Sequence, residues 1–242
     1  MYELYRKILT RKIKITTHYV PLNDSIHRHL KVKNIVDYKF FENMHMLPLQ
    51  VQEFMSAATS FPIIFTKNSQ TGEFLPVAVT SLKENSNKLM INGRWIARYL
   101  PIQVQLYPFG ASYIDNKIII GIDLNNSSVC ENGEHSLFTA DGDNTAYLNT
   151  LLELASLQAD YQEMTKHFIK TLIQHELLQP RTLTVNALDG TKTNINGIYI
   201  VDEQKIHELD ESVMLDFTKR GFYSVIYAHL CSLSLIDLVM DK

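Results

Sequence analysis

Hydrophobic and polar positions alternate along this chain in short blocks, a pattern that predicts strands as well as helices. Short apolar runs at 61–66 and 74–79, separated by a polar turn, predict a hairpin. A further strand is expected just before the Asn92-Gly93 pair, which favours a tight turn. Because Pro76 has no backbone N–H, we expect the second strand of the first hairpin to lack a neighbour near that residue.

Two more hairpins are expected further along the chain, each centred on a pair of turn-forming residues. One places strands at 113–114 and 117–123, and the other places them at 183–185 and 195–201. The central pairs are Asp115-Asn116 and Asp189-Gly190.

A spacing of three to four residues between apolar positions indicates helices elsewhere. Residues 49–58 predict a short helix, and the segment from Arg94 predicts a helix that kinks or restarts at Pro101. The apolar residues of this second helix are Trp95, Tyr99, Ile102, Leu106 and Phe109.

The longest helical segment is expected at 145–178, with a break at 157–160 because so long a helix is unusual in a globular domain. Asp202 is well placed to cap the helix that follows. The tail, 202–242, predicts two or three helices that are separated near 210–212 and at Gly221.

Together these elements predict an α+β fold, in which a mixed, mainly antiparallel sheet of hairpins is covered by the long helical segment and the C-terminal helices. A chain of 242 residues is at the upper end of what one hydrophobic core organises. We therefore expect a basic N-terminal extension at 1–17 and a single domain at 18–242, whose part 202–242 is helical.

Charge narrows the choice of partners. The net charge is −3, which provides no general attraction for nucleic acid. The eight Lys and Arg residues of 1–33 predict a solvated terminus rather than an arm for nucleic acid or lipid, because no groove-reading motif accompanies them. Residues 202–216 hold six acidic side chains against Lys205 alone, which would repel phosphates.

The cysteines and the length of the apolar runs indicate the cellular compartment of the protein. Cys130 and Cys231 are far apart in sequence and predict free thiols rather than a disulfide or a zinc site. No run approaches the roughly 20 apolar residues of a membrane span. We expect a cytoplasmic protein without a membrane span.

No complete catalytic motif is present, but the polar segment 125–143 leads into an acidic run that has two interpretations. Asp141 and Asp143 supply oxygen ligands of the kind that Ca²⁺ or Mg²⁺ prefers. The spacing fails the test for an EF-hand, so the favoured interpretation is a turn followed by a helix cap at Asp143, Asn144 or Thr145.

Histidines offer a second candidate for metal chemistry. His27, His29, His135 and His229 could join Asp141 or Asp143 in an iron or zinc site. Chance pairs are expected among nine histidines, and no metal-binding motif accompanies them, so no metal or cofactor is assigned.

The most suggestive surface combines aromatic and cationic side chains. Arg94, Trp95, Arg98, Tyr99 and Tyr107 are of the residue types that anchor peptides and protein partners. The alternative is that Trp95 and Tyr99 pack in the core and leave the two arginines exposed at the rim.

A set of short motifs is distributed along nearly the whole chain. They are Pro21-Leu22 with His27 and Leu30-Lys31-Val32, Pro48-Leu49 with Glu53-Phe54, Phe61-Pro62-Ile63-Ile64-Phe65, Phe74-Leu75-Pro76-Val77-Ala78, Gly93-Arg94-Trp95 with Tyr99 and Pro101, Tyr107-Pro108-Phe109, Leu137-Phe138 with Ala140-Asp141-Gly142, and Tyr227-Ala228-His229-Leu230 with Ser232-Leu233. In these motifs the chain resembles the bacterial SapC family from about residue 18 onward.

The resemblance implies an association with surface-layer gene clusters and with outer-membrane uptake genes, but it implies no particular reaction. It nominates a small set of positions: His27, Arg94, Trp95, Tyr99, the Asp141-Gly142 turn and His229. We therefore expect a non-enzymatic binding or accessory protein of such a system, with a protein or peptide as partner. The alternative is a metal-dependent hydroxylase or hydrolase that uses the histidines and aspartates named above.

Overall fold

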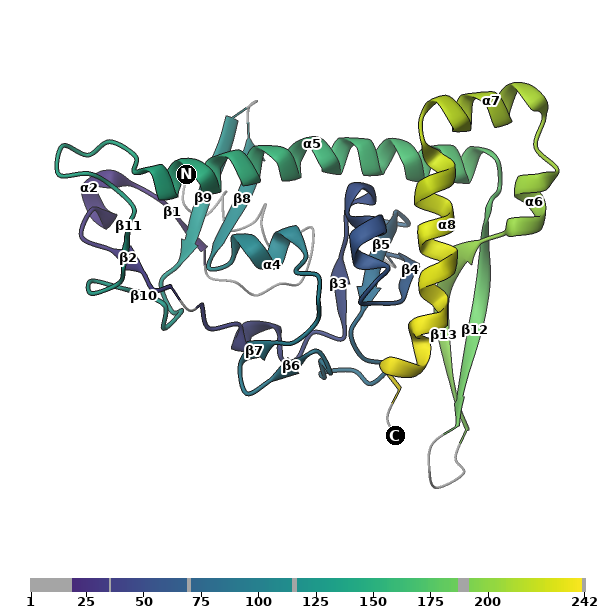
Figure 1. Ribbon diagram of the computed structural model, residues 1–242, viewed down its shortest axis with the longest axis horizontal. Helices are drawn as coiled ribbons and strands as arrows, with labels where there is room; N and C mark the ends of the chain where they lie inside the picture. The colour runs from purple at the N-terminus through teal and green to yellow at the C-terminus, as the bar shows by residue number, and fades with distance from the viewer. Residues whose placement is uncertain (1–18, 35, 69–70, 115–116, 187–191, 241–242) are drawn as a thin grey trace. The chain divides into compact units, whose positions relative to one another are not determined.

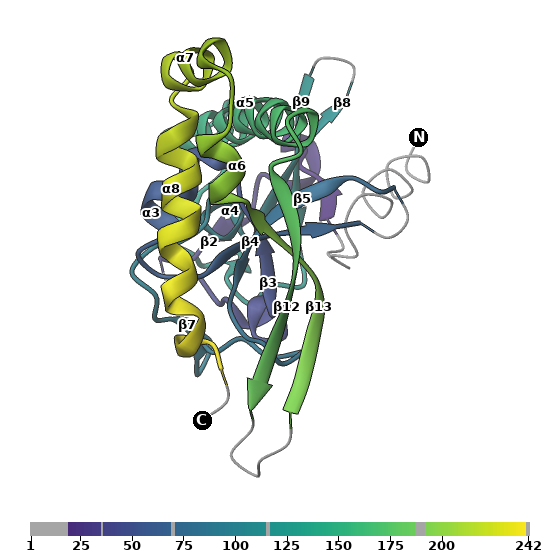
Figure 2. The same cartoon turned by 90° about the vertical axis from the view of Figure 1, so that its right-hand side faces the viewer.

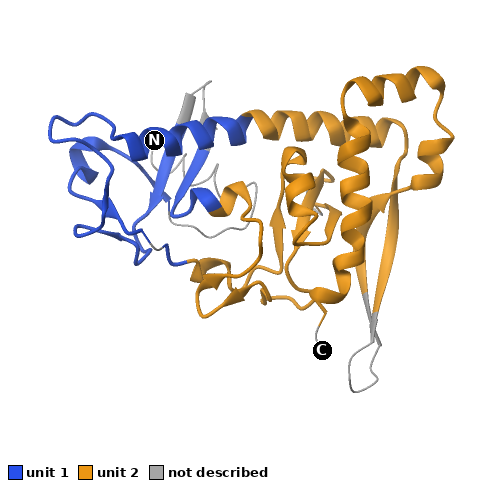
Figure 3. Cartoon of the chain, in the orientation of Figure 1, with its two compact units in different colours: residues 1–37, 105–159 blue, residues 38–104, 160–242 orange. Residues whose placement is uncertain are grey.

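The computed structural model of the protein describes residues 19–34, 36–68, 71–114, 117–186 and 192–240 (Figure 1). The predicted extension at 1–17 and the two turns at 115–116 and 189–190 lie outside these residues. The chain divides into two compact units, one of residues 1–37 and 105–159 and the other of residues 38–104 and 160–242 (Figure 3). The expectation of a single domain from residue 18 onward stays a prediction.

The second unit, 38–104 with 160–242, is organised by a five-stranded antiparallel sheet in the order β12-β13-β4-β5-β3 (Figure 1). Two of the three predicted hairpins are confirmed in it. The strands are β3 (Met46–Pro48), β4 (Ile63–Lys67), β5 (Phe74–Val79), β12 (Leu178–Asn186) and β13 (Lys192–Val201).

Pro76 marks the point where β5 loses one neighbour, as its sequence predicts. The ladder between β3 and β5 ends at the pair Pro48 and Val77. The N–H of Leu49 donates to the Pro76 carbonyl at 3.0 Å, but Pro76 has no N–H with which to continue the ladder.

Helix α8 (Phe222–Ser232) covers this sheet and packs against α3 (Phe54–Ala57), β4 and β13 (Figure 2). Its buried side chains include Ile226, Ala228 and His229. Before it come α6 (Glu203–His207), capped by the Asp202 side chain as predicted, and α7 (Glu211–Lys219), and after it the 3₁₀ helix η3 (Leu233–Leu238).

The prediction of a helix from Arg94 onward is wrong for its first half. The chain forms the short strands β6 (Met90–Ile91) and β7 (Arg94–Trp95), and only α4 (Ile102–Leu106), after Pro101, is helical. The turn between the strands explains the difference, since Asn92 and Gly93 both have positive φ, 51° and 72°, as a tight hairpin turn requires.

The predicted break in the long helix is also wrong. Helix α5 (Ala146–Gln174) is one uninterrupted helix of 29 residues and contributes residues to both units. Residues 157–160 contain neither Gly nor Pro, so nothing local ends the helix there. It ends at Gln174; Glu176, two residues later, has a φ of 51°, and β12 begins at Leu178.

The first unit, 1–37 with 105–159, contains two three-stranded antiparallel sheets, β1-β9-β8 and β10-β2-β11. The third predicted hairpin is confirmed here, in a sheet of its own. The elements are β1 (Tyr19–Pro21), α2 (Asp24–His27), β2 (Lys31–Val32), β8 (Phe109–Ile114), β9 (Lys117–Asp123), β10 (Val129–Cys130) and β11 (His135–Ser136).

Among the described residues, no single helix combines the length and the apolar composition of a membrane span. Helix α7 and the segment 222–238 meet that criterion only when taken together, and they bend by 86° at their junction.

Candidate functional site

Glu53 is the buried anchor of the candidate surface. Its side chain lies at the start of the 3₁₀ helix η2 (Val51–Glu53), where Oε2 accepts a hydrogen bond from the Gln50 N–H at 2.8 Å in a capping box. Its Oε1 accepts from the Ile102 N–H at 2.8 Å and from the Tyr99 hydroxyl at 3.0 Å. Burial raises the pKa of Glu53, although these three donors oppose the shift.

Trp95 and Tyr99 hold the chain that leads to this anchor. The Trp95 indole N–H donates to the Tyr99 carbonyl at 2.8 Å, and its ring packs against Phe61 with the centroids 6.0 Å apart. The Tyr99 N–H donates to Ser60 Oγ at 3.1 Å. Both aromatic side chains are therefore half-buried supports, which favours the packing interpretation over one in which they contact a partner.

The other end of this segment is tied at the hairpin turn. The Gly93 N–H donates to Glu42 Oε1 at 3.1 Å. Residues 91–98, called the arginine loop below, thus have a fixed turn near their start and the Tyr99 anchor directly after their end.

Five residues of the arginine loop are exposed, one of which is Asn92 in the turn. Ile91 and Ile96 are 53% and 52% exposed, and Arg94 and Arg98 are exposed as well. Within the described part of the chain, neither guanidinium has a hydrogen-bond or ion-pair partner. Unpaired guanidiniums beside exposed aliphatic side chains match a ligand that offers carboxylates next to apolar groups.

Tyr107 was grouped with this surface from the sequence, but it belongs to the first unit and is buried there. Its hydroxyl donates to Asp123 Oδ2 at 3.4 Å. Burial, with a smaller contribution from the Asp123 carboxylate, raises the pKa of Tyr107 to about 12. The residue has the environment of a structural tyrosine.

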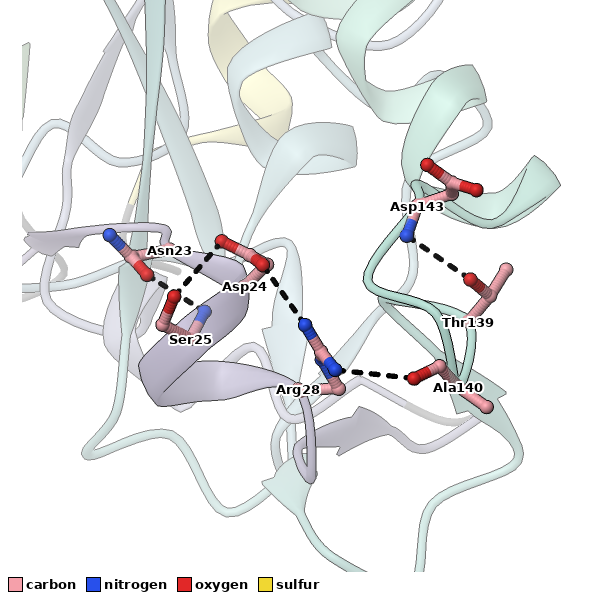
Figure 4. A network of polar contacts seen from close by, with 7 residues as sticks. All are labelled: Asn23, Asp24, Ser25, Arg28, Thr139, Ala140 and Asp143. Carbon is pink, nitrogen blue, oxygen red and sulfur yellow. Dashed lines mark hydrogen bonds and ion pairs between the residues drawn. The ribbon is translucent and has the colours of Figure 1, made fainter.

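Arg28 lies between Asp24 and the turn that carries the acidic run (Figure 4). Arg28 donates to Asp24 Oδ2 at 3.1 Å and to the Ala140 carbonyl at 3.2 Å, and its guanidinium lies against Gly142. The hydrogen bond from Arg28 lowers the pKa of Asp24. Asp141 is exposed, and Arg28 forms an ion pair with Asp24 beside this turn.

The favoured interpretation of that run, a helix cap, is confirmed at Thr145. Its Oγ1 accepts from the Leu148 N–H at 3.3 Å, in the first turn of α5. Asp143 makes a different contact, because its N–H donates to Thr139 Oγ1 at 3.1 Å and stabilises the turn before the helix (Figure 4).

His27 and His229 are both buried. His27 Nδ1 accepts from the Asn23 N–H at 3.1 Å, and burial, followed by the charge of His29, lowers its pKa. His229 Nε2 accepts from the Val201 N–H at 3.1 Å, so Nδ1 carries the proton that reaches the Ile63 carbonyl at 2.8 Å. Burial lowers the pKa of His229 to about 4, and it serves as a neutral bridge between β4 and the end of β13.

The remaining histidines of the metal hypothesis have other neighbours. His29 lies 4.0 Å from Glu131, and the His135 ring stacks on Tyr147 with the centroids 4.5 Å apart. In the part of the chain that the structure describes, no three His, Cys, Asp or Glu side chains come close enough to share a metal ion.

Comparison with known proteins gives one finding. A family model described as SapC matches residues 22–238, nearly the whole chain. The chain belongs to the SapC family. No curated protein and no solved structure matches it. The matched residues of this SapC-family chain include the arginine loop, the Arg28 network and both buried histidines.

Sequence reasoning assigned no role to Glu53, Ile91 or Ile96. The spacing of Gln50 and Glu53 was the available signal, because a polar residue followed three positions later by Glu is typical of a capping box. No local signal distinguishes the exposed isoleucines, since their exposure depends on how the loop is held.

Proposed function

We propose that this SapC-family chain is a non-enzymatic binding or accessory protein of a surface-layer or outer-membrane nutrient-uptake system. It acts from the cytoplasm and recognises a protein or peptide through the arginine loop. The observation that carries the proposal is that Trp95 of the loop and the adjacent Tyr99 make internal contacts, while Arg94 and Arg98 are exposed and have no partner among the described residues.

The chemistry of the loop supports a ligand that is acidic and partly apolar. A guanidinium forms paired hydrogen bonds with a carboxylate, and an exposed isoleucine gains stability when an apolar side chain covers it. Because both ends of the loop are already tied, binding costs less ordering entropy than a free loop would require. An acidic segment that also carries leucine or a similar residue fits all three properties.

The protein contains its own reporter for this binding. Trp95 is its only tryptophan and lies in the loop, so its fluorescence reports on the proposed site without labelling. We would titrate peptides of about 15 residues that combine Asp or Glu with Leu, and compare them with peptides in which Asn and Gln replace the acids. We expect the acidic set alone to change Trp95 emission, with an affinity that falls as salt is raised.

Arg94→Gln with Arg98→Gln keeps the side-chain lengths similar and removes both charges, and we expect at least a tenfold loss of affinity for the acidic peptides. Arg181→Gln is the matched control, because Arg181 is an exposed arginine on β12. Equal affinity in the double variant and the control would overturn the assignment of the loop.

The link to a cellular system needs a separate measurement. Proteins captured from a native lysate by the wild type and lost with the double variant would be identified by mass spectrometry. Enrichment of surface-layer or uptake components among them supports the proposal. A captured set that does not change between the two forms contradicts it.

A further inference from the structure

The second unit carries another exposed surface, of the charge opposite to that of the arginine loop. Residues 202–216 hold six acidic residues and a single Lys. Three of these charged side chains already have partners within the chain. Asp202 caps α6, Lys205 lies 3.7 Å from Glu176, and Asp216 pairs with Arg220 at 2.9 Å.

Four acids remain, at 203, 208, 210 and 211, and all four are exposed; an exposed apolar residue follows the last of them on α7. Glu208, Asp210 and Glu211 form no side-chain hydrogen bond or ion pair within the described residues, and Leu215, one turn further along α7, is 55% exposed. Glu208, Asp210, Glu211 and Leu215 are called the acidic face below. Its composition is the complement of the two arginines and two isoleucines of the arginine loop.

The two surfaces cannot meet within one molecule. Both belong to the second unit, where β6 and β7 lie at the lower end and α6 and α7 at the upper end (Figures 1 and 2). The sheet and α8 extend between them. Opposite charges at opposite ends of one unit favour contact between separate copies of the chain.

We propose that the arginine loop of one copy docks on the acidic face of a second copy, in a head-to-tail arrangement. The inference rests on the proposed function, because it uses the same loop, and it names the partner as another copy of this chain. The guanidiniums of Arg94 and Arg98 lie against Glu208, Asp210 and Glu211, and Ile91 and Ile96 cover Leu215.

The geometry of the contact determines how the assembly grows. A loop that docks on a different surface of its partner makes a heterologous contact, so one end of an open assembly has a free loop and the other end has a free face. The assembly therefore lengthens with concentration or closes into a ring. A contact of eight loop residues with one helix is smaller than a standard interface, so it is weak and sensitive to salt.

Sedimentation velocity of the full chain, at concentrations up to about 0.2 mM and at low and high salt, measures this association. We expect species larger than a monomer that increase with concentration and that high salt disperses. Arg94→Gln with Arg98→Gln removes the loop charges, and Glu208→Gln with Glu211→Gln removes most of the charge of the face. Each variant alone is expected to remain monomeric.

Mixing the two variants tests directly whether the loop of one copy binds the acidic face of another. One variant retains an intact face and the other an intact loop, so only one contact is possible and the mixture forms 1:1 dimers and nothing larger. Glu84→Gln with Glu153→Gln is the control, since both are exposed acids outside the acidic face, and it should assemble as the wild type does. Far-ultraviolet circular dichroism and urea midpoints confirm that every variant is folded.

Several outcomes overturn the inference: a wild type that stays monomeric at low salt, an assembly that persists in both variants, or a mixture that stays monomeric. The peptide titration with Trp95 then separates the two proposals. If acidic peptides still bind the loop while the wild type stays monomeric, the proposed function stands and the partner is a different protein. If neither peptides nor a second copy binds, the loop is not a recognition surface and both proposals fail.

Discussion

The Tyr99 hydroxyl donates a hydrogen bond to the buried Glu53 carboxylate at 3.0 Å, across 46 positions of sequence. Glu53 also accepts from the backbone at Gln50 and Ile102. One side chain therefore joins the start of η2, the end of the arginine loop and the start of α4. The conformation of the exposed loop depends on this buried acceptor.

Tyr99→Phe keeps the ring and removes one donor from Glu53. We expect the free energy of unfolding to fall by about 1–2 kcal/mol, because a buried carboxylate loses part of its hydrogen bonding. Urea denaturation measures the change. Tyr227→Phe, at a partly exposed tyrosine of α8, is the control and should stay within about 0.5 kcal/mol of the wild type. Equal midpoints for both variants would show that the Glu53 contact does not stabilise the fold.

His229 predicts a loss of stability in mild acid. The unfolded chain takes up a proton at this residue below about pH 6.5, whereas the folded chain does so only near its lowered pKa of about 4. The unfolded state binds more protons between these values, so the free energy of unfolding falls as the pH drops through that window. The full effect is roughly 3 kcal/mol.

His229→Gln tests that dependence, since an amide can still donate to the Ile63 carbonyl and accept from the Val201 N–H. We expect a smaller difference between the urea midpoints at pH 5 and pH 7.5 than in the wild type. The exposed His207 provides the control, and His207→Gln should leave the difference unchanged. The same pH dependence in all three proteins would exclude His229 as its source.

Alanine substitutions at Gly142 and Gly197 distinguish the cost of backbone strain from the cost of a side-chain clash. Both have positive φ, 94° and 79°, but a Cβ at Gly142 would overlap the Arg28 guanidinium, whereas a Cβ at Gly197 meets nothing within 4 Å. We expect Gly197→Ala to cost about 1 kcal/mol and Gly142→Ala roughly 2 kcal/mol in thermal or urea unfolding. In an Arg28→Ala background the two costs should become similar. A difference that persists there would show that Arg28 is not its cause.

Thr145 and Thr150 provide a matched pair in α5. Thr145 caps the first turn, so Thr145→Ala should destabilise the protein by about 1 kcal/mol. Thr150 is exposed inside the helix and returns its hydroxyl to the Ala146 carbonyl, so Thr150→Ala should be neutral or slightly stabilising. Equal losses at both positions in urea unfolding would contradict the assignment of the cap.

Local patterns predicted much of the fold because local chemistry decides those features. The three hairpins follow from apolar runs beside turn residues, and Pro76 marks a lost neighbour because it has no N–H to donate. Asp202 and Thr145 cap helices because their side-chain oxygens reach backbone N–H groups two or three residues ahead. The capping box of Gln50 and Glu53 was readable in the same way.

The conformation of the arginine loop could not be predicted from local patterns. Trp95 and Tyr99 are four positions apart, and the spacing predicted a helix, yet in the structure the indole donates to the Tyr99 carbonyl and the phenol reaches Glu53. In a helix the Tyr99 N–H would donate to the Trp95 carbonyl, whereas here it donates to Ser60 Oγ. The presence of aromatic and cationic residues was predicted, but which of them face solvent was not.

The sequence by itself determined the α+β character, the hairpins, the helix caps and the membership of the SapC family. Each of these depends on neighbouring residues or on short sequence motifs. Tertiary structure alone decided that Glu53 holds the arginine loop. It also decided that His229 bridges Ile63 and Val201. The physical reason is the same in each case: burial and hydrogen bonding depend on residues that the fold brings together from distant positions in the sequence. A local sequence pattern cannot predict these contacts.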